Sequence, residues 1–130
     1  MLNLEKMSFH DVYILGININ TKKDHFDQIT LFLESSEFVS DFATDKVILK
    51  FRECYKANLQ LQMWIEGKDS IRSFEVLEQS NLLLEAGKIL KASGSQLVTK
   101  LKHFQLNLNT SNSTIDILAE DVIVEPVSAS

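Results

Sequence analysis

A long alternation of apolar and polar residues between positions 47 and 65 constrains the fold of this chain more than any other feature. The odd positions are apolar except at Glu53, and most even positions carry a charged or amide side chain. Side chains of a strand point alternately to its two faces, so this period predicts strand structure with one buried face. One strand of that length would far exceed the usual size of about five or six residues. We therefore expect two strands within 47–66, joined by a loop around 53–56. The apolar positions are Val47, Leu49, Phe51, Tyr55, Ala57, Leu59, Leu61, Met63 and Ile65.

Shorter alternating stretches predict further strands at both ends of the chain. Residues 9–20 form one of them, with apolar residues at most odd positions. Residues 104–109 form another, in which the even positions are apolar. Two short apolar runs follow at 114–118 and 122–127, separated by Ala119, Glu120 and Asp121. We expect these two runs to be separate strands.

Two segments carry helical signals. Thr21 and Asp24 have the spacing of a capping box, and Phe26, Ile29 and Leu33 follow at helical intervals, which predicts a helix over 22–35. The segment 81–94 fits either a helix or a hairpin that turns at Ala86 and Gly87. We favour the hairpin, because a glycine within a helix costs about 1 kcal/mol relative to alanine.

These elements together predict an α+β fold. The strands follow one another without regular helical crossovers, which favours an antiparallel arrangement. We expect a curved antiparallel sheet of roughly six to eight strands, with one main helix, about 22–35, packed on it. The chain has 130 residues, 45% of them hydrophobic, which suits one domain with a core of its own. We expect this domain to span 1–127 and residues 128–130 to form a frayed tail.

Composition narrows the classes of protein to be considered. No run of about 18 apolar residues predicts a membrane span, and the first residues lack the layout of a secretory signal. The single cysteine, Cys54, excludes an internal disulfide and favours a reducing, cytoplasmic location. A net charge of −5 argues against a broad contact with nucleic acid. Residues 46–103 nevertheless hold 10 basic and 6 acidic side chains, so nucleic-acid binding is the third hypothesis, through Lys46, Lys50, Arg52 and Lys56.

No catalytic, metal or cofactor motif is recognisable. The histidines His10, His25 and His103 lie far apart in the sequence, whereas a metal site needs several ligands at close or symmetric spacing. Cys54 has no nucleophile signature around it. Gly-rich phosphate loops and serine elbows are absent. We therefore predict no metal, no cofactor and no catalytic residues, which favours a protein without enzymatic chemistry but leaves open a small enzyme that has no local motif.

The most unusual feature is the number of uncharged amides on strand faces. Asn58, Gln60 and Gln62 alternate with apolar residues and lead to Trp64, the only tryptophan. Such a face carries little charge to oppose burial, and tryptophan is enriched at binding hot spots. The first hypothesis is a protein-interaction module of the inhibitor, immunity or chaperone type, with Trp64, Gln60 and Gln62 in contact and Asn58 at the rim. The alternative is that the protein's own loops or helix cover this face. Further amides of this kind are Asn18, Asn20, Gln105, Asn107 and Asn109.

Two other expectations concern partners and ligands. An acidic protein suits a basic partner, and an exposed edge strand would allow a homodimer. The second hypothesis is a small-ligand-binding protein or small enzyme with a pocket between the helix and the concave sheet. Its candidate lining residues are Tyr13, Tyr55, Met63 and His103.

Overall fold

The computed structural model describes residues 9–21, 27–60, 70–94, 101–109 and 113–127, and strands make up most of them. This confirms a sheet-dominated mixed fold. The described residues contain six strands, β1 (Val12–Asn20), β2 (Asp27–Glu34), β3 (Lys46–Gln60), β4 (Ser70–Leu77), β5 (Lys102–Leu108) and β6 (Thr114–Pro126). The helical elements are the 3-10 turn η2 (Ser36–Phe38), the single turn α1 (Val39–Phe42) and the helix α2 (Asn81–Ala92).

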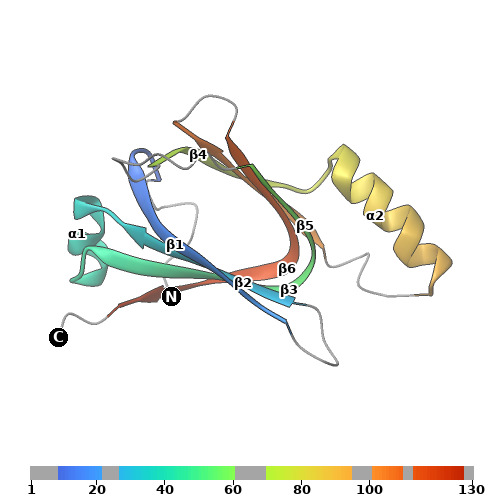
Figure 1. Ribbon diagram of the computed structural model, residues 1–130, viewed down its shortest axis with the longest axis horizontal. Helices are drawn as coiled ribbons and strands as arrows, with labels where there is room; N and C mark the ends of the chain where they lie inside the picture. Colours follow the sequence, from blue (N-terminus) through green and yellow to red (C-terminus); the bar gives the residue numbers. More distant parts are fainter. Residues whose placement is uncertain (1–8, 22–26, 61–69, 95–100, 110–112, 128–130) are drawn as a thin grey trace.

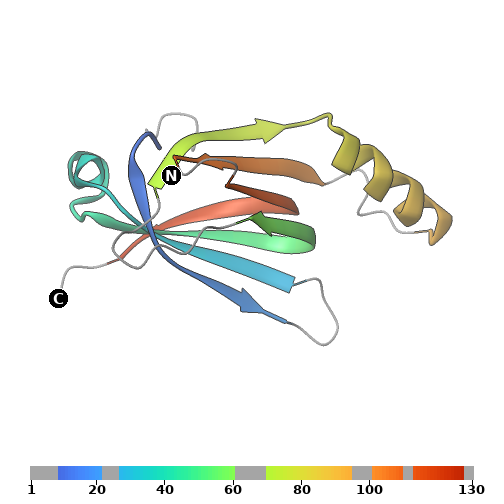
Figure 2. The ribbon, with the colours of Figure 1, turned by 45° about the horizontal axis from the view of Figure 1, so that its top comes forward.

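The strands form a closed barrel in the order β1-β2-β3-β6-β5-β4, and all neighbouring pairs are antiparallel. The closing contact is short, because Val12 and Tyr13 of β1 pair with Ile71 and Ser70 of β4 and the described pairing stops there. Figure 1 shows α1 and α2 at opposite ends of the barrel, and in Figure 2 the strands converge next to α1 and spread apart toward the end that carries α2. The two ends of the barrel therefore present different surfaces.

Side chains fill the barrel interior. Val47, Leu49 and Phe51 of β3 are fully buried, which confirms the inward face expected from the alternation. Phe51 stands edge-on to Phe104, with ring centroids 5.2 Å apart, and Phe9 stacks on Phe74 at 4.8 Å. Offset and edge-to-face aromatic pairs are favourable beyond the area that they bury. The interior described here is a packed core.

The expected break within 47–66 is a bulge inside one strand. β3 runs unbroken from Lys46 to Gln60 and pairs along its length with β6. The register shifts between Cys54 and Lys56, so Tyr55 is the extra residue, and Glu53 takes a left-handed φ of 53°. A bulge bends and twists a strand, which lets a 15-residue strand follow the barrel wall. The prediction of two strands was wrong for this reason, and residues 61–66 lie outside the described part.

The two strands expected at 114–118 and 122–127 are likewise one strand, β6, which continues through Ala119, Glu120 and Asp121. Cys54 pairs with Ala119 and Arg52 with Asp121, so the long β3 supplies hydrogen-bonding partners across the expected turn. A polar pair in the sequence does not interrupt a strand whose neighbour continues.

The helix expected over 22–35 was also wrong. Residues 27–34 form β2, which lies between β1 and β3. Ile29, Leu31 and Leu33 are buried and share one face of the strand, so period two describes the segment better than the helical spacing. Its β-branched and aromatic residues fit a pleated surface. Residues 22–26, with the proposed capping box, lie outside the described residues.

The hairpin favoured for 81–94 is a helix, α2. Ser80 caps it by accepting a hydrogen bond from the Leu83 amide at 3.2 Å, and Gly94 follows the last turn with a left-handed φ of 76°. An N-cap is worth about 1 kcal/mol, which offsets the cost of Gly87. Ala86 and Leu90 bury one side of the helix against Leu118, and this contact adds to the balance.

Candidate functional site

The strand register gathers the predicted amides into two rows on the outer surface of the barrel. One row runs Asn58, Asp116, Gln105 and Glu75 across β3, β6, β5 and β4, and the next runs Gln60, Thr114, Asn107 and Ser73. Their sequence neighbours Phe104, Leu106, Ile115 and Ile117 point into the core. We call these eight residues the amide face. Asn58, Gln60 and Glu75 are exposed, and the other five are half-buried.

Hydrogen bonds order part of this face. The Asn107 amide donates to the Ser73 hydroxyl at 3.0 Å, and Gln105 donates to Asp116 Oδ1 at 3.1 Å. Just beyond the second row, Asn109 donates to Ser70 at 2.7 Å. Side chains held in this way lose less rotamer freedom when a partner binds. Asn58 and Gln60 also line a hollow of about 390 Å³ together with Ala57, Leu59, Thr114 and Asp116.

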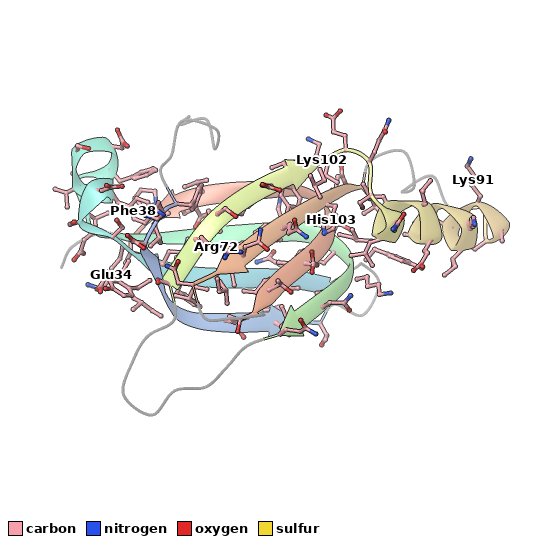
Figure 3. The ribbon with its side chains drawn as sticks, turned by 90° about the horizontal axis from the view of Figure 1, so that it is seen from above. Glu34, Phe38, Arg72, Lys91, Lys102 and His103 are labelled. Carbon is pink, nitrogen blue, oxygen red and sulfur yellow. The ribbon has the colours of Figure 1, made fainter. Side chains whose placement is uncertain are left out.

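A partly buried chain of polar side chains joins this face to α2. His103 Nε2 lies 2.7 Å from Asp116 Oδ1, and His103 Nδ1 lies 2.9 Å from Ser80 Oγ. The His103 side chain is 5% exposed and that of Asp116 15%. Figure 3 shows His103 on β5 close to the start of α2, far from Glu34 and Phe38 at the α1 end. The sequence singled out His103 but neither of its two partners.

The helix α2 packs on the outside of the barrel. Leu118 points outward, because Ile117 and Ala119 on either side of it belong to the core. Leu90 and Ala86 of α2 bury Leu118 together with Leu101 and the half-buried Tyr55. The rest of α2 projects beyond the strands in Figure 1, and Leu84 and Ile89 are 65% and 61% exposed. This helix is therefore an appendage of one barrel end, and Asn58, Gln60 and Glu75 of the amide face are exposed.

A groove of about 700 Å³ runs along one side of α2. Its walls come from the link between β4 and α2, from α2 itself and from the residue before β5. Ser80 is half-buried and belongs to the lining of this groove, whereas His103 is buried. The described lining residues are Glu78, Gln79, Ser80, Leu83, Leu84, Gly87, Lys88, Lys91 and Leu101.

Of the residues predicted to line a pocket, Tyr13, Tyr55, Met63 and His103, the structure places Tyr13 and His103 far apart. Tyr13 pairs with Ser70 at one end of β4, and His103 pairs with Leu77 at the other end. Seven residues of strand separate these positions by about 23 Å. Tyr55 and His103 both lie at the end of the barrel that carries α2. Tyr13 lines a separate polar hollow with Glu34 and Asp45. Met63 lies outside the described residues.

The basic residues of β3 face carboxylates. Lys50 lies 2.8 Å from Glu125, and Lys46 lies 3.5 Å from both Glu34 and Asp45. Arg52 forms a two-pronged pair with Asp121, with 2.8 Å from Nε to Oδ1, and this hydrogen bonding raises the pKa of Arg52 above its usual value. Lys56 is exposed. Paired in this way, Lys46, Lys50 and Arg52 form a surface of mixed charge.

The remaining candidates from the sequence are a metal site and a cysteine nucleophile. Within the described ranges, no three His, Cys, Asp or Glu side chains are grouped to hold a metal ion. Cys54 is buried, and its thiol donates to the Phe51 carbonyl at 3.1 Å. No helix among the described residues is long and apolar enough to cross a membrane.

Comparison of the chain with models of known protein families, with curated proteins and with solved structures finds no match. The residues themselves therefore carry the functional interpretation.

Proposed function

We propose that the protein is a protein-interaction module that binds its partner through the amide face. The observation that carries the proposal is the register that places Asn58 and Gln60 of β3 in line with Gln105 and Asn107 of β5. Each amide both donates and accepts hydrogen bonds, so such a surface pairs with many backbone and side-chain groups.

The charge of the face favours a basic or amide-rich partner. Its eight residues include two carboxylates, Asp116 and Glu75, and no cation. A partner that presents lysine or arginine opposite these carboxylates would gain a complementary potential. Few charges have to be desolvated on this side, which lowers the cost of burying the face.

The size of the face sets a further requirement. Four strands about 4.8 Å apart and two rows about 7 Å apart give a patch on the order of 200–300 Å². A stable interface buries about 800 Å² on each partner. The amide face is therefore the centre of a larger contact, which extends onto neighbouring residues such as the exposed Lys56. Trp64 and Gln62 were predicted for this contact and lie outside the described residues.

Affinity purification tests the proposal. The immobilised protein is compared with the double variant Asn58→Lys/Gln60→Lys, which adds two cations to the exposed side of the face. The matched control is Asn18→Lys/Asn20→Lys, which changes two exposed amides on β1. We expect a partner that the wild type and the control retain and the face variant loses, with a Kd at least tenfold weaker. A partner retained equally by all three proteins would contradict binding through the amide face.

A second copy of the chain is the alternative partner. β1 pairs with β2 along Tyr13–Asn20, and within the described residues it pairs with β4 at Val12 and Tyr13. Strand pairing along β1 is the arrangement that we expect for such a dimer. Light scattering at increasing concentration would show a dimer, and Ile17→Pro on this edge would abolish it. We expect the protein to act in a reducing, cytoplasmic setting, which a single cysteine with a buried thiol suits.

A further inference from the structure

Three side chains at the junction of the barrel and α2 form a continuous hydrogen-bonded relay. Ser80 precedes α2, His103 lies on β5 and Asp116 lies on β6. His103 bridges the other two, with 2.9 Å from Nδ1 to Ser80 Oγ and 2.7 Å from Nε2 to Asp116 Oδ1. Three residues far apart in the sequence thus join a hydroxyl, an imidazole and a carboxylate through two hydrogen bonds.

The proton positions follow from the partners. The Asp116 carboxylate only accepts hydrogen bonds, and it also accepts one from Gln105, so His103 Nε2 carries a proton. A ring that carries its proton on Nε2 alone accepts at Nδ1. The Leu83 amide donates to Ser80 Oγ, which leaves the hydroxyl proton of Ser80 free to point at Nδ1. This is the proton arrangement of a serine–histidine–aspartate triad, with the two ring nitrogens exchanged.

The surroundings of Ser80 supply the other parts of an acyl-transfer site. Ser80 lines the groove of about 700 Å³, whose walls include Leu83, Leu84 and Leu101. The amides of Asn81 and Leu82 open α2, where the first N–H groups have no acceptor within the helix. Such donors, with the positive end of the helix dipole, stabilise an oxyanion that forms beside them.

We infer that Ser80 is a nucleophile for esters with an apolar acyl chain, a function beyond the proposed protein binding. Ser80 Oγ attacks the carbonyl carbon while its proton moves to His103 Nδ1, and Asp116 stabilises the imidazolium. The tetrahedral adduct expels the alcohol, which takes the proton from Nδ1, and leaves an acyl-serine. Water then attacks the acyl-serine with His103 as base, which releases the acid and restores Ser80.

The competing interpretation is that Ser80 serves only as the cap of α2. A cap requires an oxygen that accepts from the Leu83 amide, and asparagine meets that requirement as well as serine. Ser80→Asn therefore keeps the cap and removes the nucleophile, which separates the two roles without loss of the fold. Ser93→Ala is the matched control, because Ser93 is the serine at the opposite end of the same helix, where its hydroxyl donates to the Leu90 carbonyl.

A fluorophosphonate probe tests the inference, because it phosphonylates a serine that has been activated as a nucleophile. We expect one adduct on the Ser80 peptide in the wild type and in the control Ser93→Ala, and no adduct on that peptide in Ser80→Asn. In His103→Gln we expect the labelling of Ser80 to be slowed about 100-fold or more. p-Nitrophenyl butyrate hydrolysis should follow the same order. Circular dichroism confirms that each variant is folded.

Two results would overturn the inference: no labelling of Ser80 in the folded wild type, or an unchanged labelling rate in folded His103→Gln. Asp116 belongs both to the relay and to the amide face, but the labelling experiment changes only Ser80, Ser93 and His103 and the binding experiment only Asn58 and Gln60, so either proposal can fail without the other.

Discussion

Replacing Asp116 by alanine tests the buried relay through stability. The substitution leaves the His103 Nε2–H without its acceptor in a site where the histidine side chain is 5% exposed. An unsatisfied buried donor costs about 1–3 kcal/mol, and a hydrogen bond to a charged group is worth about 1.5–3 kcal/mol. The cost of the unsatisfied donor and the contribution of the lost hydrogen bond refer to the same interaction, so they are not added. We therefore expect the free energy of unfolding to fall by about 2–3 kcal/mol. At about 3–5 °C per kcal/mol for a domain of this size, Tm should fall by about 10 °C.

Two further variants make this prediction sharp. Asp116→Asn keeps an oxygen that accepts from Nε2 and loses only the charge, so it should cost about 1 kcal/mol. Asp121→Ala is the matched control on the same strand: it removes a carboxylate paired with Arg52, and these side chains are 39% and 48% exposed. Because water screens that pair, its loss should have the smallest effect of the three.

Urea unfolding followed by circular dichroism measures all three variants, with the slope m used to check that the unfolding transition stays comparable. The reasoning would be refuted if Asp116→Ala lost no more stability than Asp121→Ala. It would equally fail if Asp116→Asn were as damaging as the alanine variant, since the acceptor rather than the bulk of the side chain carries the expected effect.

Two other predictions concern packing. Phe51→Ala should lower the free energy of unfolding by about 3–5 kcal/mol, because Phe51 is fully buried among the core aromatic rings. Urea unfolding measures this loss, and a value well below the range would indicate a loosely packed interior. Leu90→Ala should act locally, since Leu90 anchors α2 to Leu118 outside the barrel core. Hydrogen exchange should accelerate in α2 and stay nearly unchanged in β2 and β3, and equal acceleration everywhere would contradict an appended helix.

Much of the sheet was predictable from local pattern. The alternation along Val47, Leu49 and Phe51 identified the inward face of β3, because a strand with one buried face shows its period directly in the sequence. The outward amides Asn58 and Gln60 followed from the same period. In contrast, 27–34 carried both a helical and a strand period, and only pairing with β1 and β3 decided between them.

Two sequence predictions were wrong because a helix cap and a β-bulge were not recognised. Gly87 argued against a helix, whereas the Ser80 cap and the burial of Leu90 outweighed it. Glu53 argued for a turn, whereas a bulge with a left-handed residue kept β3 continuous. Each outcome depends on a neighbouring element that the local sequence does not contain.

The sequence by itself determined that the chain forms strands with one apolar face, that some outer faces carry uncharged amides, and that no contiguous motif marks a catalytic centre. These are properties of residue order, which the period of a strand makes visible. Only the tertiary structure decided that β3 and β5 lie on either side of β6, so that their amides form one surface. It also decided that Ser80, His103 and Asp116 meet. Antiparallel register couples residues across long stretches of chain, and no local pattern records which residues it will place side by side.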